Sequence, residues 1–150
     1  MKLTVVTNSL WVVDELENIE NIKLILTGGS VRPLDRGMFG QETLDFLKEH
    51  YFDKAFFSCR GLHLKNGVFD ASEIYAYLHR YLIDRSGSSY LLADHTKFGV
   101  SGFVNIIGFS DLDNLITDRP LEKEWSEEFE KNHVTVYSTQ PPAWEEGEDE

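Results

Sequence analysis

The sequence predicts an α/β fold: a mostly parallel sheet with helices on both faces. Short runs of β-branched and aromatic residues alternate along the chain with stretches whose apolar residues recur at helical spacing. This alternation is typical of strand–helix–strand crossover units, which build parallel sheets. The candidate strands are also apolar at nearly every position, as expected when helices cover both faces of a sheet.

The first third of the chain contains two strand–helix pairs. Residues 3–7 form a β-branched run that is too short for a signal peptide and predicts a strand. Residues 9–17 are expected to be helical, with the apolar side chains of Leu10, Val13 and Leu16 on one side. A second strand is predicted at 22–26, and a second helix at 41–51.

The rest of the chain continues the alternation. Strands are predicted at residues 55–59, 90–93, 114–117 and 134–137. A helix is expected over 72–85, and another from Pro120, a residue suited to the first turn because its missing N–H costs nothing there. Residues 3–138 are therefore expected to form one domain, followed by an acidic, disordered tail at 139–150.

Composition excludes several classes of protein. The 150 residues carry a net charge of −12, which argues against a chain that itself grips nucleic acid, because that requires a basic face. The single cysteine, Cys59, cannot form an internal disulfide, and no apolar run approaches the length of a membrane span. We expect a cytoplasmic protein in which local donors hold any anionic ligand.

Ligands of open parallel sheets bind beyond the C-terminal ends of the strands, so the residues that follow each strand are the candidates. Asn8 and Ser9 open the first helix, whose free N–H groups suit a phosphate, although either residue could simply cap the helix. Gly28 and Gly29 allow close approach of a ligand or form a plain turn. Arg32 could bind an anion or an acidic neighbour.

Further candidates follow the later strands. Arg60 and Gly61 come after the third strand, and Lys97 lies in the loop that follows the fourth, where it could meet a phosphate or remain solvated. Glu73 could complete a capping box with Asp70 or, if buried, act as a general base.

Motifs of other chemistries are absent from the sequence. There is no G-x-G-x-x-G, no G-x-x-x-x-G-K-[ST] and no G-x-S-x-G. The five histidines are scattered, and Cys59 with His63 is too small a set for a metal site. We expect neither a cofactor nor a metal.

A series of stretches, in order, resembles the effector-binding domain of the DeoR-type transcriptional repressors over about residues 3–137. The matching stretches are 5–10, 26–29 with Arg32, 39–40, 52–57 with Gly61, 67–73, 93–99 and 115–118. The resemblance implies a fold related to ribose-5-phosphate isomerase and the coenzyme A transferases. It also implies a phosphorylated sugar or related metabolite as effector, and a homo-oligomer.

Two parts of the family pattern are absent from this sequence. One is the N-terminal winged helix-turn-helix, through which the resemblance implies DNA is bound. The other is the first strand of the effector domain, with its Asp-x-Gly-Thr-Thr-type phosphate loop.

The resemblance favours binding over catalysis. The related isomerases place acidic groups after the third strand, where this chain has Arg60, and a guanidinium is always protonated and cannot serve as a base. A non-catalytic sensor is therefore the leading hypothesis. A sugar-phosphate isomerase with Glu73 as base and an oligomerisation domain with a vestigial pocket are the alternatives. The sequence identifies neither the effector nor the operon.

Overall fold

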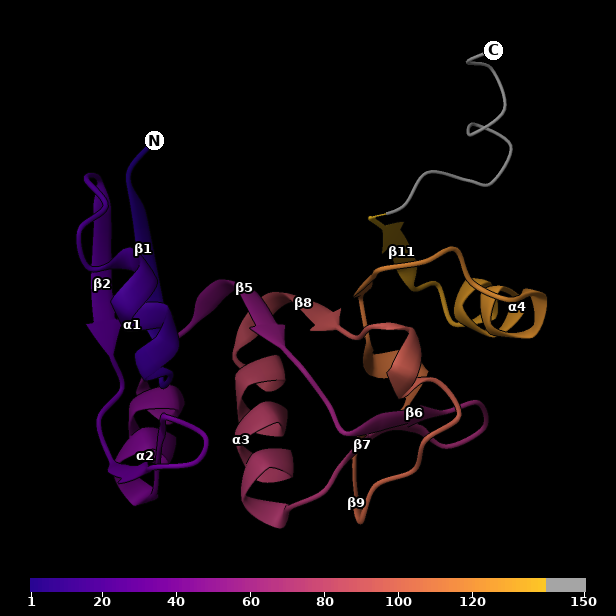
Figure 1. Ribbon diagram of the computed structural model, residues 1–150, viewed down its shortest axis with the longest axis horizontal. Helices are drawn as coiled ribbons and strands as arrows, with labels where there is room; N and C mark the ends of the chain where they lie inside the picture. The colour runs from indigo at the N-terminus through magenta and orange to yellow at the C-terminus, as the bar shows by residue number, and fades with distance from the viewer. Residues whose placement is uncertain (140–150) are drawn as a thin grey trace. The chain divides into compact units, whose positions relative to one another are not determined.

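The computed structural model describes residues 1–139, which divide into two compact units (Figure 1). The first unit is Met1–Tyr51, and the second begins at Phe52. All of the expected acidic tail except its first residue lies outside the described residues.

The first unit pairs a small parallel sheet with a hairpin and two helices. Its elements are β1 (Leu3–Thr7), α1 (Leu10–Leu16), β2 (Ile22–Leu26), β3 (Ser30–Arg32), β4 (Gly37–Phe39) and α2 (Gln41–Glu49). Strands β1 and β2 run parallel, with Thr7 opposite Leu26, so their C-terminal ends lie side by side. Strands β3 and β4 form an antiparallel hairpin.

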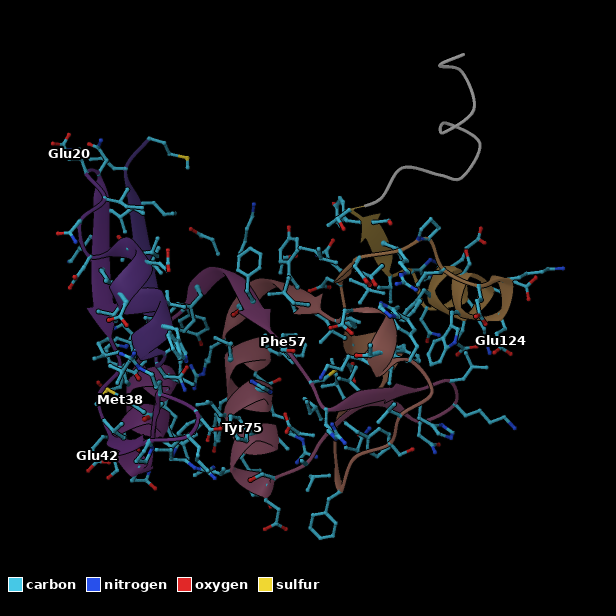
Figure 2. The ribbon with its side chains drawn as sticks, viewed as in Figure 1. Glu20, Met38, Glu42, Phe57, Tyr75 and Glu124 are labelled. Atoms are coloured by element: carbon cyan, nitrogen blue, oxygen red, sulfur yellow. The ribbon has the colours of Figure 1, made fainter. Side chains whose placement is uncertain are left out.

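The second unit is built on a parallel sheet with strand order β11-β10-β8-β5. Its strands are β5 (Phe52–Phe57), β8 (Ser86–Leu92), β10 (Asn114–Thr117) and β11 (Thr135–Ser138). Up to residue 139 this unit contains the helices α3 (Glu73–Asp84) and α4 (Lys123–Lys131), and short 3-10 turns η1 (His95–Lys97) and η2 (Phe109–Asp111) follow β8 and β9. Helix α3 connects β7 to β8 and packs on β5, where the ring of Phe57 lies 5.4 Å from that of His79 (Figure 2).

A second, antiparallel sheet lies between β5 and β10 in the sequence. Its strands are β6 (Gly61–His63), β7 (Gly67–Asp70) and β9 (Val104–Ile107), in the order β6-β7-β9. These strands have only three or four residues each, and β6 and β7 begin at a glycine, so the hydrophobic pattern did not predict them.

One core holds the second unit together. Its fully buried side chains are Leu62, Val68, Leu91, Leu115 and Phe129. They come from both sheets and from α4, so the antiparallel sheet is part of the same core as the parallel one. A Leu or Phe buried to this degree stabilises the fold by about 1.5–3 kcal/mol.

The predicted α/β class and parallel pairing are confirmed, whereas two local predictions are wrong. Helix α4 begins at Lys123, with Glu122 at its N-cap position, so Pro120 lies in the preceding loop and not in the first turn. The capping box of Asp70 with Glu73 does not form, because Ser72 is the N-cap residue and Oδ1 of Asp70 accepts a hydrogen bond from the Ala71 N–H instead. The relation to the isomerase fold stays a prediction.

No helix among the described residues is long and apolar enough to cross a membrane.

Candidate functional site

The C-terminal ends of β5, β8 and β10 meet at one edge of the parallel sheet in the second unit. Phe57 is paired with Leu91, and Leu92 with Ile116, so the three strands end level with each other. The segments that leave these ends are residues 58–60, 93–99 and 118–122. This edge is where an open parallel sheet binds its ligand.

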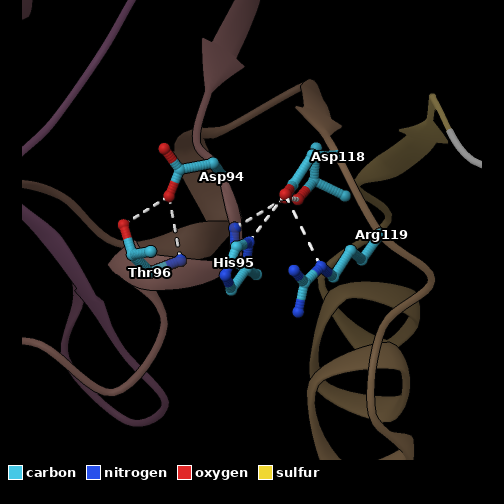
Figure 3. Close-up of polar contacts among 6 residues, drawn as sticks. Asp94, His95, Thr96, Asp118 and Arg119 are labelled. Atoms are coloured by element: carbon cyan, nitrogen blue, oxygen red, sulfur yellow. Dashed lines mark hydrogen bonds and ion pairs between the residues drawn. The ribbon is translucent and has the colours of Figure 1, made fainter.

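Asp118 ties together the loops that follow β8 and β10 (Figure 3). Its Oδ1 accepts a hydrogen bond from the backbone N–H of His95 at 2.7 Å, and its Oδ2 lies 2.6 Å from Nδ1 of the same histidine. Nε of Arg119 lies 3.8 Å from Oδ2. The hydrogen bonds from His95 hold the pKa of Asp118 below its usual value, so the carboxylate is ionised at neutral pH.

Asp94 fixes the start of the turn η1. Its Oδ1 accepts hydrogen bonds from the backbone N–H of Thr96, at 2.8 Å, and from the Thr96 hydroxyl. These bonds lower the pKa of Asp94, because they favour the charged form. Asp94 and Asp118 therefore stabilise the conformation of the loop that carries Lys97.

The same loop packs against the segment that follows β5. The backbone N–H of Gly99 donates to the carbonyl oxygen of Leu62 at 2.9 Å, and Leu62 also forms a parallel bridge with Phe98. A methyl group on Gly61 would collide with the carbonyl oxygen of Val100. Gly61 is therefore required for close packing of two backbones, which assigns it a structural role at this edge.

Lys97 is the half-buried cation of this edge. It lies near Cys59, whose buried thiol has its pKa raised to about 12, chiefly by burial and against the opposing effect of the Lys97 charge. Arg60 is exposed on the segment between Cys59 and Gly61. The structure thus brings Arg60, Gly61 and Lys97 to the adjacent ends of β5 and β8.

Glu73 is the first residue of α3 and is exposed. The general-base hypothesis required a buried carboxyl group, and the structure does not provide one at this position. The buried acid nearby is Asp70, whose Oδ2 lies 3.5 Å from Nδ1 of His79. That nitrogen makes no hydrogen bond, so the contact is an ion-pair distance without hydrogen-bond geometry.

In the first unit, Asn8 and Ser9 follow β1 as predicted. The Asn8 side-chain amide donates to the carbonyl oxygen of Met38 at 3.0 Å, and the Asn8 carbonyl accepts from the Met38 N–H at 2.7 Å. Ser9 is the N-cap residue of α1, but its side chain makes no capping bond. Asn8 therefore holds β4 against the end of β1.

Gly28 and Gly29 form the turn that ends β2. Both have positive φ, of 80° and 118°. The Thr43 hydroxyl donates to the carbonyl oxygen of Gly28 at 2.7 Å, and a Cβ on Gly29 would lie 2.6 Å from that hydroxyl oxygen. The glycines thus allow α2 to pack closely on the turn.

Arg32 is the last residue of β3 and contacts Asp35 and Phe39. Its Nε lies 3.3 Å from Oδ2 of Asp35, and its guanidinium lies 5.4 Å from the centre of the Phe39 ring. Each unit therefore carries its own group of predicted residues.

A cavity of about 490 Å³ opens beside η1 in the second unit. Its walls come from the ends of β6 and β10, the turn η1 and the start of α4, and are formed by His63, Leu64, His95, Phe98, Gly99, Thr117, Arg119, Pro120, Leu121, Glu122, Glu124 and Trp125. His63, His95 and Arg119 supply its basic side chains, and none of them was among the residues predicted to bind the effector. His95 lies three residues beyond the end of β8 and Arg119 two residues beyond the end of β10, and that position was the signal that could have found them.

A parallel α/β edge with cationic loops, in a chain without nucleotide-binding motifs, is typical of small-molecule-binding domains. The family model of the DeoR C-terminal sensor domain matches residues 1–119. The chain belongs to the DeoR family of transcriptional regulators, which confirms the resemblance seen in the sequence.

Curated relatives are regulators of the same family. The chain is 35% identical over 136 residues to the uncharacterized HTH-type transcriptional regulator YulB of Bacillus subtilis, an alignment that covers 91% of this chain and 53% of the relative. It is 32% identical over 118 residues to the glycerol-3-phosphate regulon repressor of Escherichia coli, an alignment that covers 79% of this chain and 47% of the repressor.

A third relative is the L-fucose operon activator of Haemophilus influenzae, 30% identical over 118 residues, with 79% of this chain and 47% of the relative covered. The chain spans about half the length of the curated relatives it matches.

Proposed function

We propose that this chain is the ligand-sensing part of a DeoR-type transcriptional regulator and binds a phosphorylated sugar or a related metabolite. Family membership supports a sensing role. The names of two relatives point to the class of effector, since one represses a glycerol-3-phosphate regulon and another activates an L-fucose operon. These relatives are named as regulators of transcription and not as enzymes.

The observation that carries this proposal is the position of Lys97. Its turn is fixed at one end by Asp94 and at the other by the backbone contact of Gly99 with Leu62. The backbone that carries Lys97 is therefore held near the ends of β5 and β8. A half-buried cation on this turn, with the exposed Arg60 after β5, would form a local anion site within a chain of net charge −12.

The residues of the first unit have secondary roles in this proposal. Asn8, Gly28 and Gly29 already hold backbone segments together, so their contribution to binding is through the shape of the loop. Ser9 keeps a hydroxyl free of a capping bond. Arg32, within the first unit, would bind an anion in place of the Asp35 carboxylate.

Binding would act on transcription by shifting the population of two arrangements of the whole regulator. A separate N-terminal helix-turn-helix domain would hold the DNA, as the names of the relatives suggest. The protein would work in the cytoplasm as a homo-oligomer.

The isomerase alternative has no support from the site. Glu73, its candidate base, is exposed, and a guanidinium occupies the position after β5 where the isomerases have acids.

Isothermal titration of the chain with glycerol 3-phosphate, fucose 1-phosphate and hexose phosphates tests the proposal. At least one should bind, and Lys97→Ala should weaken that binding about tenfold or more, because a charge-assisted contact is worth about 1.5–3 kcal/mol. Lys123→Ala is the matched control: it removes the same charge from a side chain that is 89% exposed. Failure of the unsubstituted chain to bind any of them, or equal affinity of the two variants, would contradict the proposal.

A further inference from the structure

The cavity beside η1 is separate from the predicted effector residues. None of these residues lines it, including Lys97, which is on the same turn. Contacts within the chain fix its walls: the rings of Phe98 and Trp125 meet edge to face with centres 5.0 Å apart, and Nδ1 of His95 lies 2.6 Å from Oδ2 of Asp118. A volume of about 490 Å³ falls within the range of small-molecule sites.

The basic side chains of the cavity present hydrogen-bond donors. Arg119 approaches Asp118 only at Nε, 3.8 Å away, and its side chain is 55% exposed, so the terminal nitrogens can form the two-pronged contact that a carboxylate prefers. Nδ1 of His63 accepts a hydrogen bond from the Lys65 N–H at 3.3 Å. The neutral His63 ring therefore carries its proton on Nε2, which is a second donor.

The other groups of the cavity restrict what can accompany the anion. Glu122 and Glu124, the latter on α4 (Figure 2), border the same space. Two carboxylates repel a dianion such as a phosphate monoester, and they accept hydrogen bonds from hydroxyl groups. Trp125 and Phe98 add an apolar wall, which suits the C–H face of a sugar.

We propose that this cavity binds a sugar acid, that is, a polyhydroxylated monocarboxylate. Arg119 would bind the carboxylate, His63 would donate to it or to a neighbouring hydroxyl, and Glu122 and Glu124 would accept from the hydroxyl groups. Because His95 in its wall belongs to the turn that carries Lys97, this second ligand would act on the loop of the effector site.

Titration calorimetry with D-gluconate and D-glucuronate tests the proposal, with glucose 6-phosphate and acetate as comparisons. One sugar acid should bind the unsubstituted chain, and Arg119→Gln should weaken it about tenfold or more through loss of the charged contact. Lys123→Gln removes one positive charge next to the cavity without touching it, and should change the affinity by less than about twofold. Absence of binding to either sugar acid, or equal losses in the two variants, overturns the proposal.

A further variant separates recognition of a sugar acid from simple attraction of an anion. In the double variant Glu122→Gln, Glu124→Gln, gluconate should lose affinity relative to acetate, because amides are weaker acceptors for hydroxyl groups than carboxylates are. An equal gain for gluconate and acetate would show that the cavity only attracts negative charge. Tighter binding of glucose 6-phosphate than of either sugar acid, lost in Arg119→Gln, would also overturn the proposal.

Discussion

Oδ2 of Asp118, one residue beyond the end of β10, lies 2.6 Å from Nδ1 of His95 in the turn that follows β8. Oδ1 of the same carboxylate accepts the backbone N–H of His95. Both side chains are partly exposed, so this contact fixes the geometry of the loops more than it stabilises the fold. It joins the wall of the cavity to the turn that carries Lys97.

Substitution Asp118→Ala should free the His95 backbone amide. That N–H donates to Oδ1 at 2.7 Å, and the variant leaves it without this acceptor. We expect faster hydrogen exchange at His95, measured by NMR, and little change at Thr96, whose N–H is held by Asp94.

The reciprocal variant, Asp94→Ala, is the control for Asp118→Ala. It should release the Thr96 amide and leave His95 protected, since each carboxylate holds a different N–H. Simultaneous loss of protection at both amides in either variant would show that the turn opens as one unit.

Burial of the Cys59 thiol should make the free energy of unfolding decrease as the pH becomes alkaline. Its pKa rises from 9.0 to about 12 in the folded chain, so the folded state favours the protonated thiol. The resulting stabilisation is complete below about pH 9 and is lost as the pH rises toward 12.

Urea unfolding at about pH 8 and about pH 10.5 measures this dependence, and Cys59→Ala serves as the reference for all other titrating groups. The original chain should lose more stability between the two pH values than the variant does. Iodoacetamide should also label the folded chain slowly at about pH 8, because the thiolate is the reactive form. Rapid labelling of the folded chain would contradict a buried, protonated thiol.

Much of the fold could be predicted because the strands of a parallel sheet are continuous apolar runs. The predicted strands at 3–7, 22–26 and 114–117 match β1, β2 and β10 residue for residue. The antiparallel sheet was not predicted because β6 and β7 are short and begin at Gly61 and Gly67, so neither shows the alternation of a strand. Strand β6 is defined by its pairing with β7, and β7 by its long-range pairing with β9, which a local pattern does not contain.

The positions of candidate residues were predictable where strand ends determine them and not where side chains compete for partners. Lys97 and Arg60 lie at the edge of the sheet because they follow strands, and their role in binding stays a prediction. The ion pair of Arg32 with Asp35 depends on the hairpin of β3 and β4, which no hydrophobic pattern in the sequence predicts. Likewise Ser72, and not Asp70, became the N-cap of α3, because Asp70 is paired within β7 and faces His79.

Gly61→Ala should disturb the packing of the loop that carries Lys97. The added methyl group would meet the carbonyl of Val100, and backbone cannot move aside as a flexible side chain can. We expect a loss of about 1–3 kcal/mol in the free energy of unfolding. Gly108→Ala is the matched control, since its added methyl would lie 3.8 Å from Oγ of Ser110. Equal midpoints of urea unfolding for the two variants would show that the loop accommodates the methyl group without loss of stability.

Phe129→Ala should be among the most destabilising single changes in the second unit. Its ring has no exposed surface, lies 4.8 Å from that of Phe109, and belongs to the core shared by both sheets. Truncation removes that burial and leaves a cavity, at a cost of about 3–5 kcal/mol. Phe103→Ala makes the same chemical change at a side chain that is 80% exposed, and should alter stability by less than about 0.5 kcal/mol. Urea unfolding of both variants measures the difference.

The milder Phe129→Leu keeps the comparison possible if Phe129→Ala does not fold, because it should still be less stable than Phe103→Ala. Equal stability of Phe129→Leu and Phe103→Ala would mean that α4 is not held by this core.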